Sequence, residues 1–173
     1  MLDVAVSYNR YKFIGHEFLT WLWYVIDNKE SDLQQLDDNQ FYLEIGNRIV
    51  LENSRAEDIE TITIKGNDAG MEEGLLSLKK GAIVTELNLI YRFGDHDWQF
   101  NIKGESLHMS GVKLPETGNI ETKEDIEGAV LEKIYLYDQL NQIMDKIFKF
   151  FIKLRVSEDW EKEHVPAMKK WII

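Results

Sequence analysis

Residues 13–26, FIGHEFLTWLWYVI, form the stretch of this chain that decides its fold. Phe18, Leu22 and Val25 recur at spacings of four and three residues, which is the apolar period of an amphipathic helix. Aromatic side chains between them widen the apolar stripe until it covers most of the helix. Such a helix is either buried deeply or placed at an interface, and the rest of the chain must supply its cover.

The aromatic side chains of this helix have a second interpretation. Trp21, Trp23 and Tyr24 are residue types on which single-stranded nucleic acids stack their bases. That use needs Lys or Arg between the aromatics, whereas here Glu17 and Asp27 flank the run. We therefore interpret the three aromatics as core residues or as part of an oligomer interface.

The composition places the chain among globular proteins of the cytoplasm. The apolar run Phe18 to Ile26 is much shorter than the roughly 20 residues that cross a bilayer, and residues 1–4 lack the basic start of a secretory signal. The absence of cysteine excludes disulfides, thiolate zinc sites and cysteine nucleophiles. A length of 173 residues is most simply one domain, with a core large enough to need no covalent staple.

The middle of the chain predicts an antiparallel sheet of about six strands. Alternation of apolar and polar residues predicts strands over 41–45, 48–51, 59–65, 82–93, 98–102 and 107–114. Gly46-Asn47 between the first two is a favoured hairpin turn. Residues 1–12 are interpreted as a strand or an irregular lead-in, residues 27–39 as a loop, and residues 68–80 as a short helix that Gly81 ends.

The C-terminal third predicts one long amphipathic helix after an acidic loop near 115–124. Apolar residues follow steps of three and four almost without interruption at Ile126, Val130, Ile134, Tyr137, Leu140, Met144, Ile147, Phe151 and Leu154. A second row, formed by Leu136, Ile143 and Phe150, favours packing against a sheet or several helices over a two-stranded coiled coil. We predict that this double row closes the core.

A short helical tail should complete the fold. Ser157 is the predicted N-cap of a new helix, and Pro166 suits the first turn of the last one. The sequence as a whole thus predicts a single α+β domain over residues 1–173. Its antiparallel sheet would pack with the aromatic N-terminal helix and the long C-terminal helix.

The charge balance bears on the class of partner. A formal net charge of −11 opposes generic binding to phosphates. One local feature is basic: Lys146, Lys149 and Lys153 step along the polar face of the long helix, and Arg155 follows. This ridge has two interpretations, a surface that tracks DNA phosphates or a set of cations that complements the negative end of the helix dipole.

No catalytic or cofactor motif is present in the sequence. The four histidines show no metal-binding spacing, and glycine-rich phosphate loops and a serine nucleophile elbow are both absent. Asp95-His96-Asp97 is interpreted as a solvated turn, and His16 as a structural residue. We therefore expect no enzyme, no metal, no cofactor and no small-molecule substrate.

Three stretches together resemble a known family. They are residues 15–23 (GHEFLTWLW), residues 111–115 (GVKLP) and residues 151–160 (FIKLRVSEDW) with the closing Trp171-Ile172. In this order they resemble the C-terminal region of longer bacterial proteins grouped with the recombination-associated protein RdgC, over residues 13–172. The resemblance implies a non-catalytic, homodimeric protein that encircles duplex DNA without sequence preference and restrains the RecA recombinase.

Two function hypotheses follow. The first is an RdgC-like accessory protein of recombination that binds duplex DNA at the nucleoid, with Lys146, Lys149, Lys153 and Arg155 as the residues that meet DNA. The second is an acidic protein-interaction or oligomerisation module with no nucleic-acid contact, suggested by the net charge and by the very apolar helix.

Overall fold

The computed structural model describes residues 13–55, 58–65 and 69–173, and within them the predicted α+β class is confirmed. In chain order the elements are α2 (Phe13–Asn28), α3 (Glu30–Gln34), β1 (Phe41–Arg55), β2 (Asp58–Lys65), α4 (Ala69–Lys79), β3 (Ile83–Phe93), β4 (His96–Lys103), β5 (Met109–Lys113), α5 (Lys123–Arg155), the π-helical turn η1 (Trp160–His164) and α6 (Val165–Ile172). The lead-in predicted over residues 1–12 lies outside the described residues.

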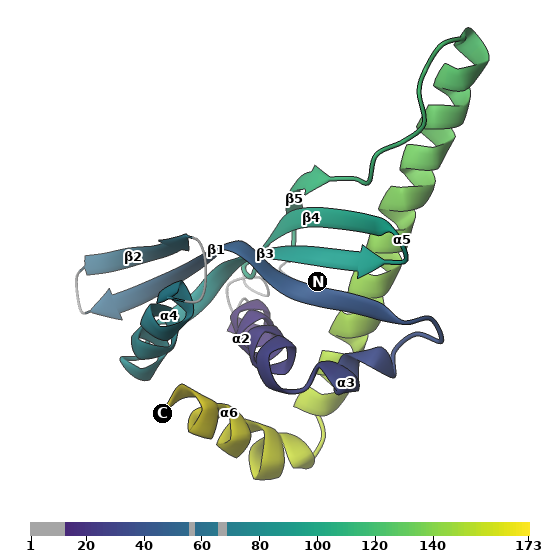
Figure 1. Cartoon of the computed structure of the whole chain (residues 1–173). Helices are drawn as coiled ribbons and strands as arrows, with labels where there is room; N and C mark the ends of the chain where they lie inside the picture. The colour runs from purple at the N-terminus through teal and green to yellow at the C-terminus, as the bar shows by residue number, and fades with distance from the viewer. Residues whose placement is uncertain (1–12, 56–57, 66–68) are drawn as a thin grey trace, which may run out of the picture.

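The five strands form one antiparallel sheet in the order β2-β1-β3-β4-β5. The sheet curls, and α2 lies between it and the C-terminal helix α6 (Figure 1). Phe18 on α2 packs against Phe148 and Phe151 of α5, with ring centroids 5.2 and 5.3 Å apart. Trp23 packs edge-on against Trp171 of α6 at 5.3 Å. The aromatic helix is thus the centre of the core.

One predicted hairpin is wrong. Residues 41–55 form a single strand, and Gly46-Asn47 is an irregularity within it rather than a turn. The side chain of Asn88 occupies this point: its Oδ1 accepts a hydrogen bond from the backbone N–H of Asn47 at 3.2 Å. A Cβ at Gly46 would stand 2.0 Å from the same oxygen. Glycine is therefore needed for a close approach between strands, not for a reversal of the chain.

Two further local predictions are also wrong. The polar stretch 27–39 contains the end of α2 and the short helix α3, because Leu33 is buried in the core at 1% exposure and holds that turn in place. Ser157 does not cap a new helix; its hydroxyl donates back to the carbonyl of Leu154 at 2.7 Å. The expected position of Pro166 in the first turn of α6 is confirmed, as is the turn at Gly81, where φ is +93°.

The long helix α5 begins at a complete capping box. The Thr122 side chain accepts from the backbone N–H of Asp125, and the Asp125 carboxylate accepts from the backbone N–H of Thr122 at 2.7 Å. These bonds, with one from the backbone of Glu121, hold the pKa of Asp125 below its ordinary value. The helix start is therefore fixed locally, without help from the core.

Only the second half of α5 closes the core. Its buried large side chains are Leu136, Leu140, Ile143, Met144, Ile147 and Phe151. The indole Nε1 of Trp98 on β4 donates to the carbonyl of Leu136 at 3.0 Å, at the level where the helix meets the sheet. Ahead of that point α5 projects beyond the sheet (Figure 1). The prediction that the whole apolar row closes the core is therefore wrong for its first half.

We predict that Gly15 fixes the distance between α2 and the sheet. A Cβ at Gly15 would come within 1.7 Å of the backbone oxygen of Gly104, whose N–H is bonded to the carbonyl of Thr85 at 2.9 Å. Because neither backbone can yield easily, Gly15→Ala should lower the free energy of unfolding by roughly 1–3 kcal/mol, measured by urea denaturation.

Gly128→Ala is the matched control. A Cβ at Gly128 meets nothing within 4 Å, and the residue lies inside α5, so this change should not destabilise the chain. Equal unfolding midpoints for Gly15→Ala and the wild type would contradict the close contact.

Candidate functional site

The cations predicted to form a basic ridge lie on α5 as expected, but most are paired with acids. Lys146 Nζ lies 2.7 Å from Asp37 Oδ2, and Lys149 Nζ lies 2.7 Å from Asp145 Oδ2. Arg155 Nε lies 2.6 Å from Glu17 Oε2 on α2. Of the four, Lys153 alone makes no ion pair with another described residue.

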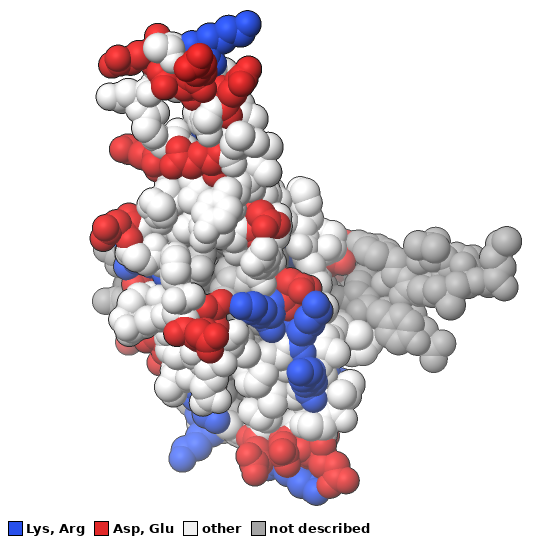
Figure 2. Space-filling view, turned by 90° about the vertical axis from the view of Figure 1, so that its right-hand side faces the viewer, with Lys and Arg blue, Asp and Glu red and all other residues white. Residues whose placement is uncertain are grey.

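The pairing weakens the field that the ridge presents to a phosphate. Figure 2 shows the Lys and Arg side chains of this face gathered below its middle, with acidic side chains beside and beneath them. Exposed ion pairs are individually weak, and a strong competitor can displace them. The ridge is thus a mixed surface whose cations are already shared with neighbouring carboxylates.

The aromatic residues predicted as core or interface are core residues. Trp21 and Trp23 are fully buried, and Tyr24 is 5% exposed. Trp21 packs against Phe151, and Trp171 covers both Trp23 and Tyr24. The interface alternative is therefore wrong for this trio, because the chain's own helices occupy the faces that a partner would need.

Among the described helices, α5 carries the most exposed large apolar side chains, and they lie on its projecting part. We name residues 123–137 the α5 arm. Its exposed large apolar side chains, each at least 39% accessible, are Ile126, Val130, Leu131, Ile134, Tyr135 and Tyr137. Within the arm Ala129 and Leu136 are buried. The arm thus carries a broad apolar surface that the described residues leave largely open to solvent.

None of these six residues is a site residue predicted from the sequence, which assigns four to the core and places the other two in no apolar row. Leu131 and Tyr135 belong to neither predicted apolar row, and they are 68% and 60% exposed. Their positions in the sequence could have indicated this exposure. The two residues lie one helical turn apart, on a side of the helix away from the row predicted to face the core. A second apolar face on a helix that already has one indicates a second contact.

The arm is also acidic, and its acids are unpaired. Residues 121–138 contain the acids Glu121, Glu124, Asp125, Glu127, Glu132 and Asp138 and the cations Lys123 and Lys133. None of the ion pairs found among the described residues includes any of these side chains. The arm therefore combines exposed apolar surface with an excess of negative charge, four acids against two lysines, and none of these six side chains makes an ion pair with a described residue.

A second feature is an apolar cleft of about 550 Å³ between α2, the end of α4 and α6. Four of its polar side chains, His16, Glu17, Thr20 and Arg155, are engaged within the chain. His16 Nδ1 lies 3.1 Å from the carbonyl of Val84, and Thr20 donates to the carbonyl of His16 at 3.1 Å. Glu17 and Arg155 pair with each other at its wall. The cleft offers apolar volume but no nucleophile beside a base.

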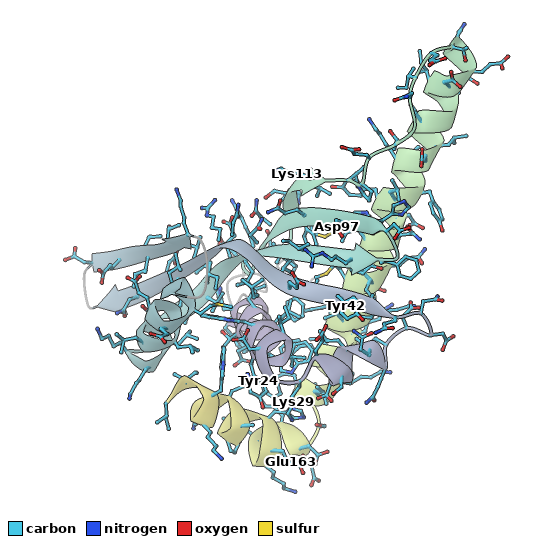
Figure 3. The ribbon with its side chains drawn as sticks, in the orientation of Figure 1. Tyr24, Lys29, Tyr42, Asp97, Lys113 and Glu163 are labelled. Atoms are coloured by element: carbon cyan, nitrogen blue, oxygen red, sulfur yellow. The ribbon has the colours of Figure 1, made fainter. Side chains whose placement is uncertain are left out.

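The remaining titratable residues do not converge on a metal or a reacting centre. Among the described residues no group of three His, Asp or Glu side chains is placed to hold a metal ion. At the predicted turn, Asp97 pairs with Arg92 at 3.3 Å and the His96 ring packs edge-on against Trp98. Asp97, labelled in Figure 3, therefore has a cation partner on the neighbouring strand β3.

Comparisons of the chain with models of protein families, with curated proteins and with solved structures find no match. In the part of the chain that the structure describes, no helix has both the length and the apolar character to span a membrane. The function must therefore be argued from the surface itself.

We predict that the Lys146–Asp37 pair persists in solution. The Lys146 ammonium and the backbone N–H of Asn39 hold the pKa of Asp37 below its ordinary value. Lys146→Met should therefore raise that pKa, measured by an NMR titration of the Asp37 carboxyl. The pair stabilises the fold above the ordinary pKa of Asp, and this contribution is lost as the pH falls through the lowered pKa.

Lys149→Met is the control for this titration, because Lys149 pairs with Asp145 and not with Asp37. An Asp37 pKa that is the same in Lys146→Met and in the wild type would mean that Lys146 is available to other anions.

Proposed function

We propose that this chain is a non-catalytic protein-interaction module and that the α5 arm is its working surface. The observation that carries the proposal is the exposure of six large apolar side chains on the α5 arm, most of which projects beyond the sheet. Exposed apolar patches rimmed by polar residues are typical of binding surfaces. Covering such a patch is worth about 25 cal/mol for each Å² removed from water.

The construction of the arm supports a role that is separate from stability. The capping box fixes the helix start at Thr122 independently of the core. Ahead of Leu136 the arm adds no large side chain to the core, since the large buried residues of α5 begin at that residue. A helix extended by about four turns past its core adds exposed apolar surface without adding core contacts, and a binding partner accounts for both features.

We predict that a photo-crosslinking amino acid at Leu131 captures a discrete protein partner in native cells. The side chain at this position is 68% exposed on the arm. The partner should lose its crosslink when Val130→Asp is added, because a charge on the apolar surface costs binding energy. The readout is the mass of the crosslinked adduct on a gel.

The matched control places the same crosslinker at Ile59, which is 71% exposed on β2. Adducts of equal mass and amount from both positions would mean random collision. A lack of any adduct at Leu131, with the protein folded, would contradict the interaction role of the arm.

A second candidate function is the RdgC-like one, in which the chain binds duplex DNA and modulates recombination. Lys149 and Lys153 favour it, because both are exposed and lie one turn apart on one face of α5. The net charge of −11 opposes it. The ion pairs of Lys146, Lys149 and Arg155 would have to open for phosphates to bind.

The RdgC-like function predicts salt-sensitive binding of duplex DNA that weakens in Lys146→Glu/Lys149→Glu/Lys153→Glu. Reversal of three cations should lower affinity roughly tenfold or more, measured by gel shift at about 50 and about 200 mM salt. Wild-type binding that the triple variant retains would remove these lysines from the interface. No binding at the lower salt would exclude this function.

A further inference from the structure

We infer that the partner of the α5 arm is a basic amphipathic helix, with an apolar face flanked by Lys and Arg. The inference rests on the proposed function and adds the chemistry of the partner. Its evidence is the arrangement of charge around the exposed apolar residues of the arm.

The acids of the arm lie beside its apolar surface rather than on a remote face. Glu127 stands three and four residues before Val130 and Leu131, so its carboxylate neighbours both on the helix surface. Glu124 stands four residues before Gly128 and three before Glu127, one turn nearer the tip. A partner that covers the apolar residues must therefore bring its own edge against these carboxylates.

The acids of the arm differ from the charged residues at the C-terminal end of α5 in having no ion-pair partner among the described residues. There the charged residues Lys146, Lys149 and Arg155 each have an acid within 2.7 Å. In the arm, Asp125 is held by the capping box, and just after the arm Asp138 accepts a hydrogen bond from Gln142 at 2.6 Å. Glu124, Glu127 and Glu132 make no ion pair with any described residue. Cations from another molecule would complete the same pattern at the tip.

The charge also argues against a second copy of the chain as the occupant. Two arms placed face to face would bring together two sets of unpaired carboxylates, and like charges across an interface oppose association. A cationic partner gains attraction at the same positions. Figure 2 shows acidic side chains gathered at the projecting end of the molecule, with a basic side chain among them at the tip.

The secondary structure of the partner follows from the shape of the arm. The exposed apolar residues spread along several turns of one straight helix, which presents ridges and grooves that a second helix fits. A helix with apolar residues at steps of three and four residues matches this surface along its length, as in helix-in-groove recognition. We therefore assign the arm a helical, cationic partner.

The test measures binding of three synthetic peptides by fluorescence anisotropy. The first is a helix of about 15 residues, the length of the arm, with Leu on one face and Lys at its edges. The second has Glu in place of each Lys, and the third keeps the basic composition but scatters Leu around the helix. We expect the first to bind the wild-type chain at least about tenfold more tightly than the other two.

Variants of the chain locate the binding. Val130→Ser/Ile134→Ser should weaken binding of the basic amphipathic peptide about tenfold, and Glu124→Gln/Glu127→Gln should weaken it and reduce its salt dependence. Ile59→Ser, an exposed apolar change outside the arm, is the matched control and should bind like the wild type.

The outcomes separate the two proposals. Equal binding of the acidic and basic amphipathic peptides, lost in Val130→Ser/Ile134→Ser, would overturn the cationic partner and leave the arm as an interaction surface. Equal binding of the basic peptide by all variants would overturn the inference as non-specific attraction. A dimer in sedimentation that dissociates in Val130→Ser/Ile134→Ser would replace the basic helix with a second copy. An adduct from Leu131 together with no peptide binding would overturn only the partner chemistry.

Discussion

The fold depends on the need to bury α2 on every side. Its central residues Trp21, Leu22 and Trp23 are all fully inaccessible to water, so one packing surface cannot satisfy the helix. The curled sheet covers one side, where Gly15 and Gly104 let the two backbones approach. The second half of α5 and the short helix α6 cover the other side through their aromatic residues. Each later element of the chain thus has a position set by the apolar surface that α2 presents.

This constraint also explains why α5 is longer than the core. A helix of 16 residues extends about 24 Å and one of 33 residues about 50 Å, at 1.5 Å for each residue. The core around α2 therefore occupies only part of α5, and the bond from Trp98 to the carbonyl of Leu136 marks the level at which the sheet is reached. The part ahead of it receives no cover from α2. Its exposed apolar residues add nothing to the closing of the core, and the proposed recognition surface would account for them.

The sequence predicts the positions of helices and strands better than it predicts which of them come into contact. The period of residues 13–26 identified α2, and alternation located β2, β3, β4 and β5, because these signals are local. The hairpin at Gly46 failed because the reason for that glycine is the Asn88 side chain on another strand. The prediction that the first part of α5 closes the core failed for a similar reason. Periodicity says that Ile126 and Val130 share a face with Met144, but not where along the helix the sheet ends.

The charges along α5 also depend on contacts that the sequence does not reveal. These contacts change the part of the helix that we expect to meet a partner. The sequence places acids at the start of the helix and cations at its end, as the helix dipole favours. From the sequence alone we expect the cations to be the exposed feature against an acidic background. In the folded chain Asp37 and Glu17, from other elements, take up Lys146 and Arg155. No cation among the described residues does the same for Glu124 or Glu127. Folding therefore neutralises much of the basic end and leaves the acidic end, which also carries the exposed apolar surface, as the part of α5 with unpaired charge.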